Sequence, residues 1–156
     1  MGVITSNRGA ASSGIFSNIL ELNSNVFIAR NICSQILGNV LSERGILNNE
    51  AIAITYNRAS RISGNTTRYV TNNTVNNIIS NNTTPWSKGI GYNIIAGALS
   101  GNQTTSNIIG NISNSIYDNG PLIGTIAGNI IDGDILENNN DGDIIGNYTG
   151  DIKNNY

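Results

Sequence analysis

Residues 25–43 read NVFIARNICSQILGNVLSE, and their apolar residues recur at every fourth position in two neighbouring rows. The first row is Ile28, Ile32, Ile36 and Val40, and the second is Ala29, Cys33, Leu37 and Leu41. A wide apolar stripe with this spacing is typical of an amphipathic helix. Ser24 or Asn25 can cap the start of such a helix, and Gly45 can adopt the left-handed conformation that follows its end. The stretch therefore predicts a helix that buries one face.

Similar spacing predicts further helices on both sides of this stretch. They cover about 13–22, 49–62, 67–79, 84–101 and 107–117. The helix from Thr84 has the clearest start signal, because a capping hydroxyl is followed by Pro85 at the first helical position. Trp86 comes next and is the single tryptophan, so we expect it to pin this helix to its neighbours.

The predicted fold class is all-α, a bundle of five to six helices over residues 12–118. The turns between the helices are short, so consecutive helices are expected to pack antiparallel. The predicted core consists of Ile28, Ile32, Ile36, Val40, Ile52, Tyr56, Ile62, Ile78, Trp86, Ile94 and Leu99.

Two terminal segments are predicted to lie outside the bundle. Residues 1–11 are small and polar, which predicts a disordered lead. Residues 119–156 contain a degenerate Gly-polar-Ile repeat, for example Gly128-Asn129-Ile130 and Gly142-Asp143-Ile144. Irregular spacing of these units argues against a solenoid with a fixed period. We expect a flexible or weakly β-prone tail; the competing interpretation is that the units stack as a small β layer.

The residue types needed for most enzyme chemistry are scarce. The chain has no histidine, which removes the commonest general base and the commonest metal ligand. The two lysines, Lys88 and Lys153, do not follow a glycine-rich phosphate-binding loop. The sequence therefore predicts no catalytic residue, no cofactor site and no metal site, and a protein that is not an enzyme.

One segment resembles part of a calcium-binding loop. Residues 137–144 read ENNNDGDI and place oxygen-bearing side chains at the first, third and fifth positions, with glycine at the sixth. The twelfth position is Tyr148 where an EF-hand has a bidentate glutamate. A solvated acidic turn explains the segment equally well, so no metal ligand is assigned.

Charge and hydropathy limit the class of partner. Charged residues are 12% of the chain and the formal net charge is −2, which favours self-association over binding to nucleic acid. No apolar run is long enough for a membrane span. The single cysteine, Cys33, excludes an internal disulfide, and we expect it to be a small buried hydrophobe; a disulfide between two chains is the alternative.

A family resemblance rests on residues 27–79. They comprise a predicted helix from Phe27 to Ser42, a turn at 45–49, a second helix ending at Ile62, a turn at 63–67 and a helix opening at Tyr69. This order resembles the repetitive helical domain of spider silk proteins, most of all the aciniform, or wrapping-silk, type. The chain departs from that family in being rich in Asn and Ile where silk repeats are rich in Ala and Ser, and its tail lacks a poly-Ala or Ser-rich texture.

The resemblance implies a helical globule with a disordered linker, secreted and extracellular, stored in solution and assembled into fibres. We therefore expect a structural, self-assembling fibre module that converts partly to β-structure on assembly. Two alternatives stay open. One is an extracellular adhesion or binding module for ice, glycan or calcium, and the other is a viral or phage structural protein.

Overall fold

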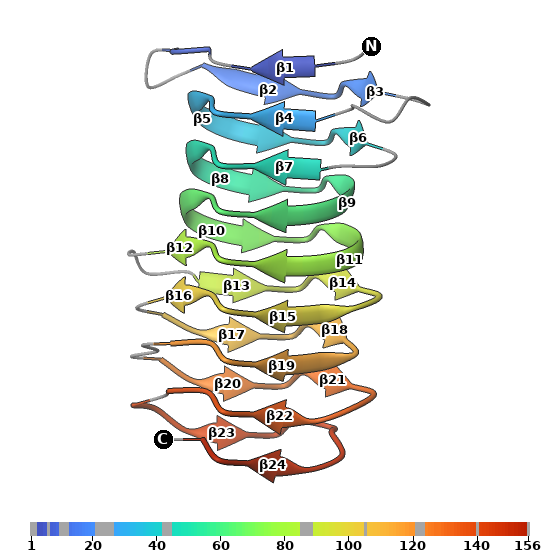
Figure 1. The fold of residues 1–156 in the computed structure, drawn as a ribbon, viewed down its shortest axis with the longest axis vertical. Helices are drawn as coiled ribbons and strands as arrows, with labels where there is room; N and C mark the ends of the chain where they lie inside the picture. Colours follow the sequence, from blue (N-terminus) through green and yellow to red (C-terminus); the bar gives the residue numbers. More distant parts are fainter. Residues whose placement is uncertain are drawn as a thin grey trace.

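The chain forms a parallel β-solenoid of about seven turns (Figure 1). The computed structural model describes residues 3–5, 7–9, 13–20, 27–41, 45–84, 89–104, 106–120, 124–139 and 141–155. Within these residues there are β-strands and no helix. The first and last strands lie at opposite ends of the coil (Figure 1).

The strands form two sheets, and neighbouring strands in each sheet are parallel and about one turn apart in sequence. The 14-stranded sheet contains β1 (Val3–Thr5), β3 (Ile19–Leu20), β4 (Phe27–Ala29), β6 (Val40–Leu41), β7 (Gly45–Leu47), β9 (Arg58–Ser63), β11 (Thr74–Ser80), β14 (Ile94–Ile95), β15 (Ala98–Ser100), β18 (Ile112–Ser113), β19 (Ser115–Tyr117), β21 (Ile130–Ile131), β22 (Ile135–Leu136) and β24 (Ile152–Lys153). The 10-stranded sheet contains β2 (Gly14–Phe16), β5 (Ile32–Leu37), β8 (Glu50–Thr55), β10 (Thr66–Thr71), β12 (Thr83–Thr84), β13 (Gly89–Gly91), β16 (Gln103–Thr104), β17 (Ile108–Ile109), β20 (Ile126–Ala127) and β23 (Ile144–Ile145).

A four-residue motif turns the chain from one sheet to the other. It consists of an aliphatic residue that faces the core, a residue that ends the strand, a residue with positive φ, and an asparagine at the corner. Ile54-Thr55-Tyr56-Asn57 is one example, in which Tyr56 has a φ of 55°. A left-handed conformation costs a non-glycine residue roughly 1–2 kcal/mol, so something at the corner has to offset that strain.

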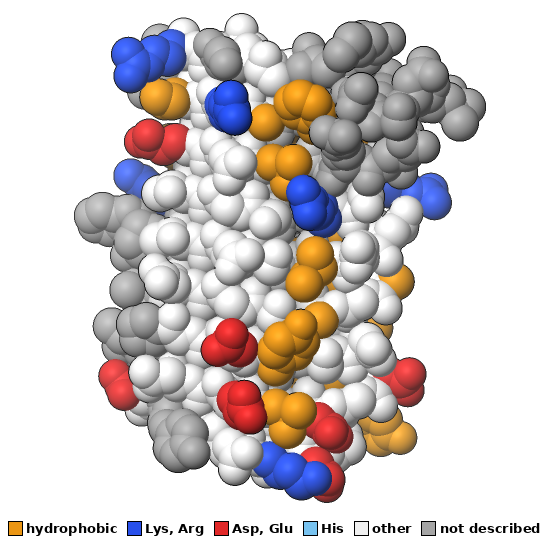
Figure 2. Space-filling model, in the orientation of Figure 1, with side chains coloured by type: hydrophobic (Ala, Val, Ile, Leu, Met, Phe, Trp, Pro, Cys, Tyr) orange, Lys and Arg blue, Asp and Glu red, His pale blue; other side chains and the backbone are white. Residues whose placement is uncertain are grey.

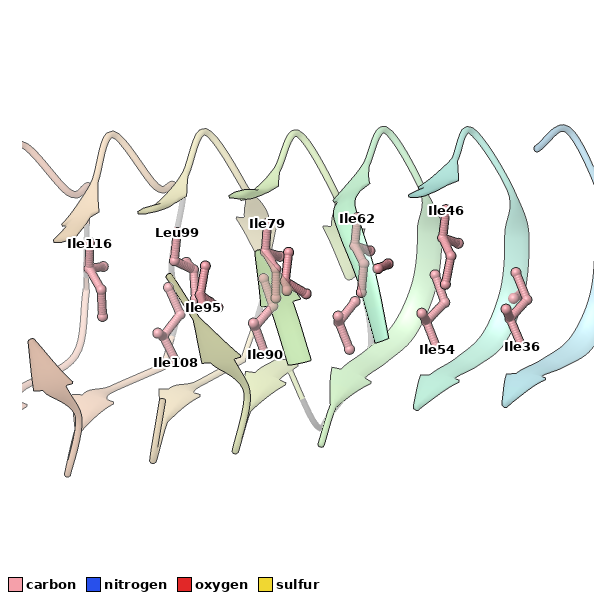
Figure 3. Packing of buried hydrophobic residues seen from close by; sticks show 14 of the residues in the cluster. Ile36, Ile46, Ile54, Ile62, Ile79, Ile90, Ile95, Leu99, Ile108 and Ile116 are labelled. Carbon is pink, nitrogen blue, oxygen red and sulfur yellow. The ribbon is translucent and has the colours of Figure 1, made fainter. Parts of the chain in front are cut away.

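The core lies between the two sheets and consists of stacked aliphatic columns. The column from the 14-stranded sheet is Ile28, Ile46, Ile62, Ile79, Leu99, Ile116 and Ile135, and the facing column from the 10-stranded sheet is Ile36, Ile54, Val70, Ile90, Ile108 and Ile126; all are buried. Figure 3 shows the two columns meeting across the interior. β-Branched side chains pack well on pleated sheets, which explains why isoleucine dominates both columns.

The predicted all-α bundle is wrong, and the residues of its clearest helix show why. Ile28 and Ile36 lie in different strands on opposite sheets, and both point into the core. Their separation of eight residues is one half-turn of the solenoid, and it is also a multiple of the four-residue spacing of a helix. Ile32 is only half-buried and Val40 is exposed, so the apparent stripe does not form one buried face.

The predicted core is correct in part. Ile28, Ile36, Ile62 and Leu99 are buried core residues. Tyr56 and Ile94 are instead more than half exposed, and Ile52 and Ile78 are half-buried. Trp86, with its predicted role in pinning a helix, lies outside the described residues.

Residues 124–139 and 141–155 continue the same coil beyond the predicted boundary at residue 118. β19 pairs with β22, and β22 pairs with β24. Ile126, Ile131 and Ile135 are buried in the core. The period is not constant, because successive corner asparagines are 16 to 20 residues apart between Asn31 and Asn155.

We predict slow amide exchange in these C-terminal turns. The Ile126 amide donates to the Asp143 carbonyl oxygen at 2.9 Å, and the Ile135 amide donates to the Asp151 carbonyl oxygen at 2.9 Å. Both residues are buried, and their acceptors lie in the last turn of the coil, so exchange of these amides requires that turn to open. Hydrogen exchange of dilute protein should show protection at Ile126 and Ile135 well above that of an unfolded peptide and below that of Val75 near the middle. Exchange at the rate of an unfolded peptide would instead support a flexible tail.

Candidate assembly interface

Two ladders of asparagine side chains run along the corners of the solenoid. The first ladder is Asn7, Asn31, Asn49, Asn65, Asn82, Asn102, Asn119, Asn138 and Asn155. The second ladder is Asn18, Asn39, Asn57, Asn73, Asn93, Asn111, Asn129 and Asn147. From Asn18 onward, each ladder asparagine follows a residue with positive φ.

In each inner rung, the side-chain amide of the asparagine has hydrogen-bond partners for its NH2 group and for its oxygen. The Asn57 side chain is buried, and its Nδ2 donates to the Ile36 carbonyl oxygen at 2.9 Å and to the Thr55 carbonyl oxygen at 2.9 Å. Its backbone N–H and Nδ2 both donate to Oδ1 of Asn73, at 2.9 and 3.1 Å. A side chain with two donor hydrogens and an acceptor oxygen on a short stem fits this role. These bonds offset the strain of the left-handed residue at each corner.

The ladders have a direction. Every rung donates from its backbone N–H and Nδ2 to the Oδ1 of the rung nearer the C terminus, as Asn7 does to Asn31 and Asn129 does to Asn147. At the N-terminal end, no described residue donates to Oδ1 of Asn7 or Asn18. At the C-terminal end, the described residues offer the backbone N–H groups of Asn147 and Asn155 no acceptor. Within the described part of the chain, one end of the ladders thus presents acceptors and the other presents donors.

Three of the four ends of the core columns are partly open, whereas the fourth, Ile15 at the N-terminal end of the second column, is buried. Ile152 pairs with Ile135 in the first column, yet Ile152 is 49% exposed whereas Ile135 is 0% exposed. Ile4 and Ile144 occupy the equivalent end positions and are only half-buried. The end rungs therefore expose apolar positions that the inner rungs cover.

Charge is distributed along the axis of the coil. All six arginines lie at or before Arg68, and all six aspartates lie at or after Asp118. Residues 1–78 carry six Arg and three Glu, a net charge of +3, whereas residues 79–156 carry two Lys, six Asp and one Glu, a net charge of −5. Figure 2 shows mostly basic groups over one half of this face and mostly acidic groups over the other, with one acidic group in the basic half and one basic group at the acidic end. Lys153 at that end pairs with Asp151.

A separate apolar column runs along the outside of the 14-stranded sheet. Ile94, Ile112 and Ile130 stack on one another and are each 45–54% exposed. Nearer the N terminus the same column contains Arg58 and Thr74, which interrupt it. This column provides a comparison surface for the ends, because it exposes the same residue type on the side of the coil.

The three side chains at the ligand positions of the calcium-loop pattern are Glu137, Asn139 and Asp141, and all three are exposed. Asn138, between the first two, is a buried rung of the first ladder, so its amide is committed to other contacts. Among the described residues, no group of three acidic, histidine or cysteine side chains could hold a metal ion.

Cys33 is half-buried against the core cluster, and burial raises the pKa of its thiol. A raised pKa lowers the thiolate fraction near neutral pH and makes the thiol less reactive. Lys88 lies outside the described residues.

The two asparagine ladders were not predicted from the sequence. The signal that marks them in the sequence is a recurring order of an aliphatic residue, two intervening residues and an asparagine.

No protein-family model, no curated protein and no solved structure matches the chain. The resemblance to spider silk repeats therefore rests on residues 27–79 alone, and the described residues of this segment form strands and turns, without a helix. Among the described residues there is no helix long and apolar enough to cross a membrane.

Proposed function

We propose that this chain is a structural module that associates with copies of itself to build rods or fibres. The observation that carries the proposal is the state of the end rungs, where Ile152 is 49% exposed in a column that is otherwise buried. A strand edge with unpaired backbone groups and an apolar column is a template for another strand. The low charge density of the surface offers little repulsion between copies.

The proposal keeps the fibre function expected from the silk resemblance and changes its mechanism. A helical globule would have to convert to β-structure when it assembles. The strands of this chain already exist in the monomer, so assembly would only add rungs to sheets that are formed. The absence of an enzymatic activity stays a prediction from the lack of histidine.

The test measures association of the 156-residue chain as its concentration rises, by sedimentation velocity and negative-stain electron microscopy. We expect elongated oligomers. Ile152→Asp places a charge on the exposed end of a core column and should weaken association about tenfold or more, since each 1.4 kcal/mol changes an equilibrium constant tenfold. Ile112→Asp is the matched control on the outer column and should have little effect.

Two results would contradict the proposal. A native chain that stays monomeric up to its solubility limit has no self-association to explain. A larger loss from Ile112→Asp than from Ile152→Asp would show that copies associate through the side of the coil and not through its ends.

A further inference from the structure

One rung of the first ladder is followed by a residue that can react with it. Asn119-Gly120 is the single Asn-Gly pair in the sequence. In such a pair the backbone nitrogen of glycine can attack the side-chain carbonyl carbon of asparagine, because glycine has no side chain to hinder the close approach. We infer that Asn119 is a deamidation site that is inert in the folded coil, reacts once the coil opens there, and then prevents the coil from closing again.

The reaction needs only water as a second reactant. The Gly120 nitrogen loses its proton and forms a bond to Cγ of Asn119, and the side-chain nitrogen leaves as ammonia. Water then opens the resulting cyclic succinimide at either of its carbonyl carbons. The products are aspartate, with the original backbone, and isoaspartate, in which the backbone runs through the former side chain and is one methylene longer. No group is oxidised or reduced.

The folded coil holds the Asn119 amide away from this attack. Asn119 is buried, with 1% of its surface exposed. Its Oδ1 accepts from the backbone N–H and Nδ2 of Asn102 at 3.0 and 2.9 Å. Its Nδ2 donates to Oδ1 of Asn138 at 2.9 Å. The amide is thus bound on both sides, and turning Cγ toward the Gly120 nitrogen would break these bonds.

The attacking nitrogen is restrained as well. The Gly120 N–H donates to the Asn102 carbonyl oxygen at 2.9 Å. This hydrogen bond stabilises the protonated nitrogen, whereas the attack requires the deprotonated form. Asn102 therefore binds both the attacking group and the amide that it attacks. Separation of the Asn102 and Asn119 rungs is a required step, so the rate of deamidation follows the local opening of the coil.

Neither product fits the ladder. The Asn119 Nδ2 donates to the Leu99 and Tyr117 carbonyl oxygens at 3.0 and 2.9 Å, in addition to its bond with Asn138. A carboxylate in its place has no hydrogen to donate and brings a charged oxygen against these acceptors in a buried site. Isoaspartate adds a methylene to the backbone, which displaces the following residues from the positions where they pair.

Deamidation at Asn119 therefore makes an opening of the coil permanent. The strands that follow Asn119 are β20, β21, β22, β23 and β24. They contribute Ile135 to the core and Ile152 to the C-terminal end. A chain that has reacted keeps the earlier turns but no longer stacks these strands on them in register.

The protection is tested on the full chain in two states at one mildly alkaline pH, folded and unfolded in guanidinium chloride. Peptide mapping by mass spectrometry measures the conversion of Asn119 with time. We expect conversion in the folded chain to be about a hundredfold slower or more, since each 1.4 kcal/mol of opening free energy slows it about tenfold. Asn111 is the internal control, because it is also a ladder rung but is followed by Ile112, whose branched side chain hinders the attack. In the unfolded chain Asn111 should convert far more slowly than Asn119.

Asn119→Asp supplies one product directly. Asn114→Asp is its matched control, because Asn114 precedes β19 where Asn119 follows it, is exposed, and gains the same charge. Urea unfolding followed by circular dichroism should give a folding equilibrium constant for Asn119→Asp about tenfold or more below that of Asn114→Asp. An Asn119→Asp chain that does not fold, beside a folded Asn114→Asp chain, is the extreme form of the same result.

Three results would overturn the inference. Equal conversion rates at Asn119 in the folded and the unfolded chain would show that the ladder does not protect it. An unfolded chain that stays intact at Asn119 has no such reactive site. Converted chains that refold with the urea midpoint of the unreacted protein would show that the product does not prevent closure. None of these results bears on self-association, which is measured on unreacted protein.

Discussion

Asn73→Ala is expected to lower the free energy of unfolding by about 3–5 kcal/mol. Asn73 is a buried rung of the second ladder, and its Nδ2 donates to the carbonyl oxygens of Ile54 and Thr71 at 2.9 and 3.0 Å. Its Oδ1 accepts from the backbone N–H of Asn57 at 2.9 Å. Alanine leaves the buried backbone N–H of Asn57 without its acceptor and removes a donor from each carbonyl oxygen, although the Thr71 oxygen still accepts from the Tyr56 N–H at 3.4 Å. A buried group left without a partner costs about 1–3 kcal/mol.

Urea unfolding followed by circular dichroism measures this effect, with Asn76→Ala as the matched control. Asn76 lies three residues further along, in β11, and is exposed, so its replacement should change stability by less than about 0.5 kcal/mol. Equal effects of the two substitutions would mean that the ladder contributes no more than any surface asparagine.

Gly45→Ala is the second substitution with a large expected effect, and it should also lower the free energy of unfolding by about 3–5 kcal/mol. Gly45 has a φ of 113°, and a Cβ built there would lie 1.9 Å from the Arg61 carbonyl oxygen in the neighbouring strand. Backbone atoms of β9 cannot move away without breaking the pairing with β7. The cost therefore combines about 1–3 kcal/mol of dihedral strain with about 1–3 kcal/mol of overpacking.

Gly128→Ala is the control for the dihedral contribution alone. Gly128 also has positive φ, at 61°, but a Cβ there would meet no atom within 4 Å. We expect it to cost roughly 1–2 kcal/mol, the usual penalty for alanine in the left-handed region. Thermal and urea unfolding of both variants give the comparison. A Gly45→Ala variant as stable as Gly128→Ala would show that adjacent rungs are not held at the described spacing.

The sequence predicted several features of this chain correctly and still led to the wrong fold class. Burial of Ile28, Ile36 and Leu99 followed from hydrophobicity alone. The turn at Gly64 was also recognised, because glycine before asparagine marks a change of direction in either fold. The error came from periodicity, since a half-turn of eight residues and two helical repeats of four place apolar residues at the same positions.

The asparagine ladders illustrate a second limit of prediction from the sequence. Asn65 was interpreted as part of a turn, and the structure shows it accepting from Asn49, which is 16 residues away, and donating to Asn82, which is 17 residues away. Nothing within a window of a few residues distinguishes such an asparagine from one in a solvated loop. The repeated order of aliphatic residue and asparagine is visible in the sequence, but its meaning depends on what stacks above and below.

The sequence by itself determined which positions are aliphatic, where left-handed residues and asparagines stand, and that basic residues precede acidic ones. Tertiary structure alone decided that Ile28 pairs with Ile46 and that Ile46 faces Ile54 across the core (Figure 3), because the partners are contributed by other strands of the coil. Strand pairing is nonlocal: each strand bonds to residues about 16 to 24 positions away. Local preference for helix or strand is weak in a chain of Ile, Asn, Ser and Gly, so stacking of whole turns decides the fold.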